Sequence, residues 1–250
     1  MDSNFNYSLT TNGVTFNYLK SKSISERELH DYNELLFYID GEATLHTENY
    51  KQKLTPNTLV FIPKGKYHFL SLSNPDNFTR LKISFDCGAL TSQLPSDILV
   101  SKNLPTLTLS LLENALIGLK NDNFTNDFYY GAFLLLASWL STSATSQVKF
   151  DGEDTLVSNC AKYIENNLSN NLSIAKISES LNFSPSTVSH VFKRQTGISI
   201  HNYIVQKRMI YAKKLLETKS PTQVHLECGY ADYSSFYKAY VKMFGKSPKD

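Results

Sequence analysis

Small polar and basic side chains are concentrated in one short stretch near the C-terminal end of the chain. Their hydroxyl and imidazole groups can hydrogen-bond to base edges, and their cations can bind phosphates. A second set of hydroxyl, aromatic and basic side chains follows about 47 positions later. If a helix presents each set on one face, the candidate DNA-binding residues are Ser186, Thr187, Ser189, His190, Lys193, Arg194, Tyr233, Ser234, Tyr237 and Lys238.

The two sets lie in two copies of one sequence pattern. Pairs 47 positions apart are Ile177 with Val224, Leu181 with Cys228, and Phe183 with Tyr230; pairs 48 apart are Val188 with Phe236, Phe192 with Tyr240, Gly197 with Gly245, and Ser199 with Ser247. Each copy predicts a short helix, a tight turn and a second helix that ends at a glycine, over 173–197 and 220–245. This is helix-turn-helix geometry, in which the second helix enters the major groove of DNA.

One long helix is predicted between the copies, from Ser199 to Thr218, with its apolar face formed by Ile200, Ile204, Tyr211 and Leu215. Residues 173–249 carry 12 basic and 4 acidic side chains, a net charge of +8, whereas residues 1–150 carry 12 and 14, a net charge of −2. Such asymmetry is typical of a nucleic-acid-binding module, although a solvated basic helical surface would have the same charge.

The C-terminal hundred residues resemble the DNA-binding domain of the AraC/XylS family of transcriptional regulators. The matching stretches are LSIAKISESLNFSPSTVSHVFKRQTGIS at 172–199, YIVQKRMIYAKKLLE at 203–217 and ECGYADYSSFYKAYVKMFGKSP at 227–248. The resemblance implies that the two helix-turn-helix units contact successive major grooves. Two positions depart from the family pattern, since His225 replaces a small alanine and Pro221 an aliphatic residue.

The N-terminal part predicts a β-structure followed by helices. Short apolar runs bounded by turn residues at 34–41 and 58–63, and strict alternation at 79–86, predict strands of a barrel or sandwich within 14–86. Helices are predicted at about 105–145, and the small polar stretch 141–147 predicts a linker. We therefore expect an α+β chain, with a cupin-like barrel and two helices in domain 1–146 and an all-α domain in 151–250.

The leucines Leu109, Leu112, Leu116 and Leu119 form an apolar stripe on the first of these helices. Two uses of the stripe are open: packing on the barrel, or the seam of a homodimer. Aromatic residues on the candidate strands also have two uses, the walls of a ligand cavity or a barrel filled solid. They are Phe16, Tyr18, Phe37, Tyr38, Phe61, Tyr67, Phe69 and Phe85.

HDYNELLFYIDGE at 30–42 and VFIPKGKYHF at 60–69 are similar to the cupin-type sensor of the same family. His30, Glu34 and His68 fall at positions that bind metal in enzymatic cupins, but Glu28 stands where those enzymes have a further histidine. We therefore expect no metal and no cofactor. We expect an apolar or amphipathic organic effector instead, with the candidate binding residues His30, Glu34, Phe37, Tyr38 and His68.

These features together predict a sequence-specific transcription regulator that binds double-stranded DNA and is controlled by a small effector. The family resemblance implies activation through contact with RNA polymerase. The alternatives are an orphan regulator whose barrel only dimerises or contacts proteins, and a metal-dependent cupin enzyme fused to a DNA-binding domain. We expect no enzymatic activity.

The remaining features bear on the cellular environment. The chain has no long apolar run and its N-terminus lacks a signal-peptide pattern, so we expect a bacterial cytoplasmic protein without membrane contact. Cys87, Cys160 and Cys228 share no metal-ligand spacing and are expected to be reduced thiols.

Overall fold

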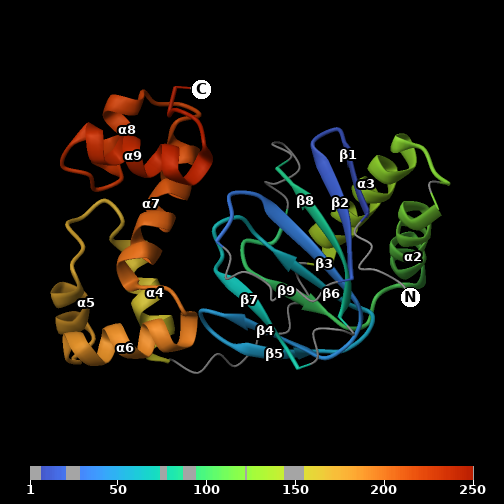
Figure 1. Cartoon of the computed structure of the whole chain (residues 1–250), viewed down its shortest axis with the longest axis horizontal. Coiled ribbons are helices and arrows are strands. Elements are labelled where there is room, and N and C mark those ends of the chain that lie inside the picture. Colours follow the sequence, from blue (N-terminus) through green and yellow to red (C-terminus); the bar gives the residue numbers. More distant parts are fainter. Residues whose placement is uncertain are drawn as a thin grey trace. The chain divides into compact units, whose positions relative to one another are not determined.

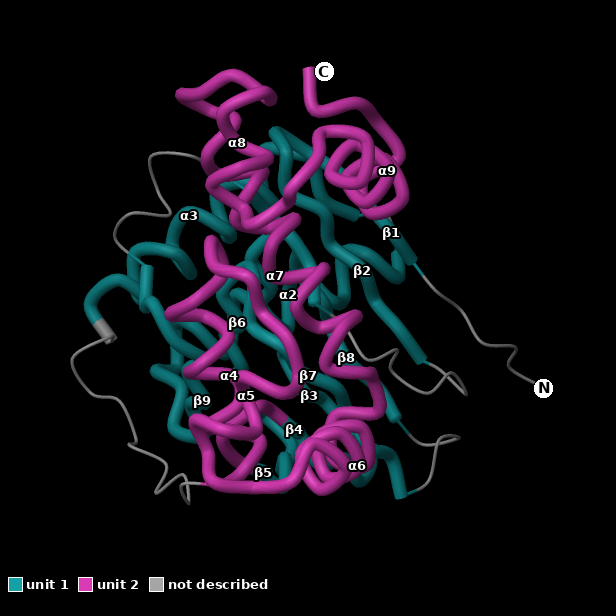
Figure 2. The backbone as a smooth tube through the Cα atoms, turned by 90° about the vertical axis from the view of Figure 1, so that its left-hand side faces the viewer, with its two compact units in different colours: residues 1–46, 51–151 teal, residues 47–50, 152–250 magenta. Residues whose placement is uncertain are grey.

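The computed structural model describes residues 7–20, 29–73, 78–86, 94–121, 123–143 and 155–249. The chain divides into two compact units, residues 1–46 with 51–151 and residues 47–50 with 152–250 (Figure 2). Some predicted features lie outside the described residues: Glu28, Cys87, and 144–147 of the linker.

Unit 1 contains two antiparallel sheets (Figure 1). The larger has the order β1-β2-β8-β3-β6-β9 and the smaller the order β5-β4-β7. The strands are β1 (Tyr7–Thr11), β2 (Val14–Lys20), β3 (Asn33–Asp40), β4 (Ala43–Thr47), β5 (Lys51–Leu54), β6 (Thr58–Ile62), β7 (His68–Leu72), β8 (Thr79–Phe85) and β9 (Leu99–Ser101). The predicted β-rich N-terminal part is confirmed, but strands β1 and β9 lie outside the predicted range 14–86.

Helices α2 (Thr106–Asn121) and α3 (Asn126–Ser143) pack on one face of the larger sheet, close to the predicted helical range. Leu81, Ile83 and Phe85 of β8 lie in this core, as their alternation predicts. Five of the aromatic residues expected near a ligand cavity lie in the same core: Phe16, Tyr18, Phe37, Phe61 and Phe85. Of the two uses left open by the sequence, the contacts favour core packing for these five, because helices cover the face on which they lie.

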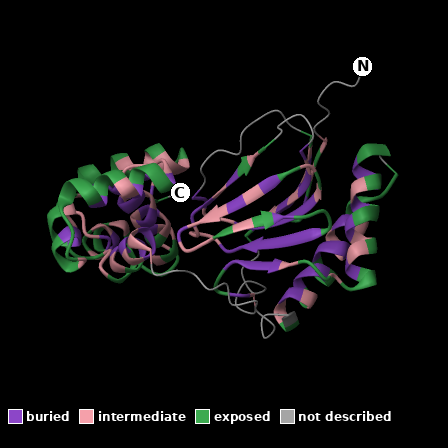
Figure 3. Cartoon of the chain, turned by 90° about the horizontal axis from the view of Figure 1, so that it is seen from below, coloured by how far each residue is buried: buried purple, intermediate pink, exposed green. Residues whose placement is uncertain are grey.

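The leucine stripe of α2 belongs to the core of unit 1. Leu112 is fully buried and Leu119 is 8% exposed, while Leu109 and Leu116 are partly buried against the same cluster. The exposed residues lie on the outer sides of the two helices (Figure 3). Of the two uses left open by the sequence, the contacts favour packing on the sheet.

We predict that Leu112→Ala destabilises unit 1 by about 2–5 kcal/mol, since it leaves a cavity in a closed core. The single tryptophan, Trp139, lies in α3, so its fluorescence during urea unfolding reports on this unit. Ile117→Ala is the matched control, because Ile117 lies on the same helix and is 49% exposed. Equal stability of the two variants, with loss of self-association only for Leu112→Ala, would instead indicate a dimer seam.

Unit 2 is helical apart from residues 47–50. Its helices are α4 (Leu156–Asn166), α5 (Ile174–Ser180), α6 (Pro185–Thr196), α7 (Ile200–Leu215), α8 (Pro221–Glu227) and α9 (Tyr233–Phe244). Cys160 and Cys228 are buried here, and burial raises the pKa of their thiols to about 11 and about 12. Both thiols therefore remain protonated and unreactive near neutral pH.

The internal repeat of the sequence is a repeat of structure. Helices α5 and α8 each have 7 residues, and α6 and α9 each have 12. The intervening turns place Asn182 and Gly229, 47 positions apart, at positive φ. Gly197 and Gly245 end the longer helices in the left-handed conformation. The two helix-turn-helix units are thus equivalent down to their caps.

Helix α7 differs from its prediction in the side chains that it buries. Ile200 and Ile204 are buried as expected, but Tyr211 is 37% exposed. Tyr203, Met209 and Ala212 are buried instead. A single apolar stripe was the wrong expectation, since α7 packs against α6 near its start and against α8 and α9 further along.

Candidate nucleic-acid interface and buried polar cluster

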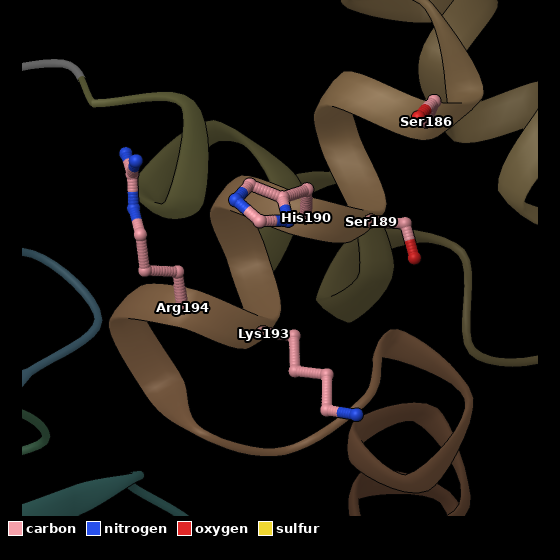
Figure 4. Close-up of a pocket in the computed structure, with 5 residues that line it drawn as sticks. All are labelled: Ser186, Ser189, His190, Lys193 and Arg194. Atoms are coloured by element: carbon pink, nitrogen blue, oxygen red, sulfur yellow. The ribbon is translucent and has the colours of Figure 1, made fainter.

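The predicted residues of the first helix-turn-helix unit lie together on the surface of α6. All six are exposed, and five of them line one hollow: Ser186, Ser189, His190, Lys193 and Arg194 (Figure 4). The sixth, Thr187, is part of the helix start: its hydroxyl lies 2.8 Å from that of Ser184, whose Oγ accepts a hydrogen bond from the Thr187 amide. The surface thus combines hydrogen-bonding groups with two cations in the last turn.

This arrangement follows from the spacing of the buried residues. Val188, Phe192 and Thr196 are separated by four positions and face the core, so the polar side chains between them project outward. Pro185 occupies the first turn, where its missing N–H costs nothing, and Gly197 ends the helix. The residues at the two ends of α6 therefore determine where the polar surface begins and ends.

The second unit presents a similar but unequal surface on α9. Ser234, Tyr237 and Lys238 are exposed, whereas Tyr233 is half-buried and packs near Phe236. The offset of 48 positions also pairs the exposed Ser235 with Thr187, and Lys242 with Arg194. Ser235 is absent from the predicted set, although this offset was available from the sequence.

The two departures from the family pattern are accommodated in α8. Pro221 is the first residue of the helix, and the preceding Ser220 amide donates to the Gln223 side chain at 3.2 Å. His225 is half-buried, with its ring at right angles to Tyr233 at 5.7 Å, and its Nδ1 atom has no hydrogen-bond partner among the described residues. The imidazole therefore packs as an aromatic group in the second unit.

Unit 1 contains a buried polar cluster formed by His30, Glu34 and His68. Their ligand atoms lie within 4.8 Å of one another, and all three residues are buried. Both imidazoles have Nδ1 beside a backbone carbonyl oxygen, His30 at 2.7 Å from Tyr32 and His68 at 3.2 Å from Lys66. Since a carbonyl can only accept, each Nδ1 carries the hydrogen. His30 Nε2, 3.3 Å from Glu34 Oε2, therefore donates to that carboxylate only when the ring is protonated.

Phe37 and Tyr38 of the predicted effector set lie on opposite faces of β3. Phe37 belongs to the helix-covered core, whereas Tyr38 shares a face with Glu34 by alternation along the strand. The buried Tyr38 packs near Phe78 at 5.7 Å, and the Arg80 guanidinium lies over Phe78 at 5.0 Å. The structure therefore groups His30, Glu34 and His68 but separates Phe37 from them.

Lys82 on β8 completes the polar cluster, although it is not among the residues predicted from the sequence. Its Nζ lies 2.9 Å from Glu34 Oε2 and donates to the Tyr32 hydroxyl at 3.2 Å. Burial raises the pKa of Glu34, but the His30 contact and the Lys82 charge outweigh burial and hold this pKa far below its usual range. Two features of the sequence could have indicated this contact. Lys82 alternates with the apolar residues of β8, and Glu34 lies on the strand that pairs with β8.

Two histidines and a carboxylate are donors that transition metals accept. Here, however, Glu34 Oε2 is already paired with the Lys82 ammonium group, and a divalent ion would have to displace that cation. The positive charge that a metal would supply to the carboxylate is thus supplied by the chain itself.

We predict that Glu34→Gln destabilises the protein at neutral pH by roughly 3–5 kcal/mol, because it leaves Lys82 without its buried counter-charge. The pKa of Glu34 is lower in the folded than in the unfolded protein, so its contribution is complete above about pH 4.3 and falls below it. The difference between wild type and variant in urea unfolding should therefore shrink as pH decreases from 5 to 3.

The exposed Glu42 provides the control, since Glu42→Gln should leave stability and its pH dependence nearly unchanged. A Glu34→Gln protein as stable as wild type at pH 7 would contradict the assigned ion pair.

A duplicated helix-turn-helix with an exposed polar and basic face defines a DNA-binding regulator, and comparisons with known proteins agree. Residues 177–250 match the family described as a helix-turn-helix domain, and residues 20–115 match the AraC-like ligand binding domain. The chain belongs to the AraC family of transcriptional regulators.

Similar curated proteins are also regulators. The probable transcriptional regulator LumQ of Photobacterium leiognathi is 38% identical over 34% of this chain and 36% of its own length. The uncharacterized HTH-type regulator YobQ of Bacillus subtilis is 25% identical over 88% and 86%. The XylDLEGF operon transcriptional activator of Pseudomonas putida is 23% identical over 74% and 68%. This chain thus spans about a third of LumQ but most of YobQ.

Among solved structures, unsaturated fatty acid bound ToxT from Vibrio cholerae has a TM-score of 0.43 at 15% identity, covering 99% of this chain and 95% of that one. A similarity of this size supports no functional inference. Within the described residues, no helix is long and apolar enough to span a membrane.

Proposed function

We propose that unit 2 binds double-stranded DNA in a sequence-specific manner through α6 and α9, each placed in a major groove. The observation that carries the proposal is the exposed face of α6, where Ser189 and His190 lie between the helix start and the cations Lys193 and Arg194. Base-reading groups and phosphate-binding groups are thus adjacent on one rigid helix. On one side of B-DNA, the two helices would contact sites about 34 Å apart.

The residues assigned to this surface are those predicted from the sequence, with Ser235 and Lys242 added on α9. Tyr233 contributes less than its neighbours, since it is half-buried. In this proposal the DNA-binding domain comprises residues 151–250 and the sensor domain residues 1–146.

We predict that Lys193→Ala and Arg194→Ala weaken binding to all DNA sequences alike. Each variant should reduce the slope of log affinity against log salt concentration by roughly one unit if the side chain contacts a phosphate. Fluorescence anisotropy over a salt series measures this slope. The exposed Lys102 of unit 1 is the control, and Lys102→Ala should leave the slope unchanged.

Ser189→Ala and His190→Ala should instead relax the preference for particular bases, by about 1–3 kcal/mol for each good contact. Binding-site selection from a random library, followed by sequencing, shows the preference at each base pair. If His190→Ala selects the same sites with the same discrimination as wild type, the base-contact assignment is wrong.

We propose further that unit 1 binds a small organic effector beside His30, Glu34, Tyr38 and His68. Because this face also carries Lys82 and Arg80, the effector is expected to have a polar or charged group. Of the apolar or amphipathic compound expected from the sequence, this favours the amphipathic one. Effector binding controls transcription only if its affinity differs between two states of the protein. Thermal-shift screening of the chelator-treated full chain tests both the binding and its independence of metal.

Activation through RNA polymerase is part of the same proposal. The description of the Pseudomonas putida relative as a transcriptional activator supports activation. A homodimer is compatible with the exposed Leu107 on α2 and Leu135 on α3. Transcription in vitro from a selected site, with purified bacterial polymerase, distinguishes activation from repression. An orphan regulator would regulate from that site with no response to any compound that shifts thermal stability.

A further inference from the structure

Arg208 lies in the middle of α7, the helix between the two helix-turn-helix units. Its side chain contacts the segment that joins α4 to α5, just before the first helix-turn-helix. The Nε atom donates to the Leu168 carbonyl oxygen at 3.1 Å, and Nη2 donates to that of Asn170 at 2.7 Å. One edge of the guanidinium is thus fixed to the first half of the DNA-binding unit.

The same guanidinium contacts the turn of the second unit. Its Cζ lies over the Tyr230 ring at 5.5 Å, and Gly229 lies against it at φ +73°. A Cβ atom on Gly229 would overlap Arg208 Nη2 and would lie only 2.7 Å from the Leu168 carbonyl oxygen. The turn between α8 and α9 therefore approaches the segment before α5 closely, with the planar guanidinium filling the junction.

The position of this junction matters because the two helix-turn-helix units otherwise contact different parts of α7. Phe192 of α6 packs on Tyr203 near the start of α7, whereas Met209 and Ala212 belong to the cluster of α8 and α9. Arg208 touches both halves at once. Guanidinium geometry suits this role, since it offers several donors in a rigid plane and can stack on an aromatic ring.

We propose that Arg208, seated against Gly229, is a positioning residue that fixes the separation and orientation of α6 and α9, and hence the spacing of the two DNA segments that the protein accepts. This inference rests on the proposed DNA-binding function. Without the guanidinium, each unit keeps its own core and its own recognition helix, but the two units can turn relative to one another.

The test uses the full chain and a duplex selected by wild type from a random-sequence library. Three derivatives are made: one with a base pair inserted between the two footprinted segments, and two in which one segment is scrambled. For wild type, the insertion rotates one segment about the DNA axis and should reduce affinity about tenfold or more. Arg208→Lys should bind the parent duplex more weakly than wild type does, whereas its affinity for the scrambled duplexes should equal that of wild type. The loss of affinity caused by the insertion, the insertion penalty, should therefore fall below about threefold.

Two further variants isolate the cause. Gly229→Ala keeps the charge but adds the obstructing Cβ, and it should also reduce the insertion penalty. Lys214→Met removes an exposed charge from the same helix and should leave the penalty at its wild-type value. Thermal unfolding of each protein shows whether it is folded at the assay temperature. If Arg208→Lys is unfolded there, the insertion penalty of Gly229→Ala tests the inference.

Several outcomes overturn the inference. Equal weakening of Arg208→Lys on all four duplexes would make Arg208 a phosphate contact or a general stabilising residue. An unchanged insertion penalty in both Arg208→Lys and Gly229→Ala would show that α7 alone sets the spacing. If wild type selects no duplex at all, the proposed DNA-binding function fails as well, and this result is distinct from a selected duplex with no spacing preference.

Discussion

The DNA-binding unit depends on one long helix, α7, which packs against α6 of the first helix-turn-helix and against α8 and α9 of the second. Helices α5 and α8 have seven residues each, too few to be stable in water by themselves. Each is retained by its buried residue, Ile177 or Val224, and by the longer helix that follows it. Because α7 contributes to the packing of both units, the surfaces of α6 and α9 exist as defined surfaces only while α7 is in place. Contacts far from any DNA therefore determine what the exposed side chains can reach.

In unit 1 the constraint is the unequal chemistry of the two faces of the larger sheet. Helices α2 and α3 cover one face with apolar side chains, which accounts for the burial of Leu112 and Phe85. The opposite side of β3 and β8 carries Glu34, Lys82 and Arg80, which are buried or nearly so and must be paired. A sheet with this division has a stable apolar core that does not need an effector. Its polar face is the part on which a bound molecule can alter charge pairing.

Periodicity and turn chemistry carried most of what could be predicted from the sequence. The 47- and 48-residue offsets, the caps and the glycine stops predicted both helix-turn-helix units, and the comparisons confirm the family. Alternation identified the two faces of β8, yet it could not show which face α2 and α3 would cover, so Phe37 was grouped with Glu34. The Lys82 contact was missed for a related reason, since it depends on the pairing of β3 with β8. Tyr211 was assigned to the core because a single stripe was assumed for a helix with partners on different sides.

The two recognition helices are equivalent in backbone but not in chemistry. At the positions where α6 has His190 and Lys193, α9 has Lys238 and Val241, and Ser189 corresponds to the larger Tyr237. The second unit also packs His225 and Tyr233 around Phe236, so more of its aromatic surface is used internally. If both helices enter DNA, small side chains favour close approach of α6 to base edges, whereas α9 depends more on long and bulky groups. A rigid junction between the units then matters most for α9, because the tighter contact of α6 determines where the second helix meets the DNA.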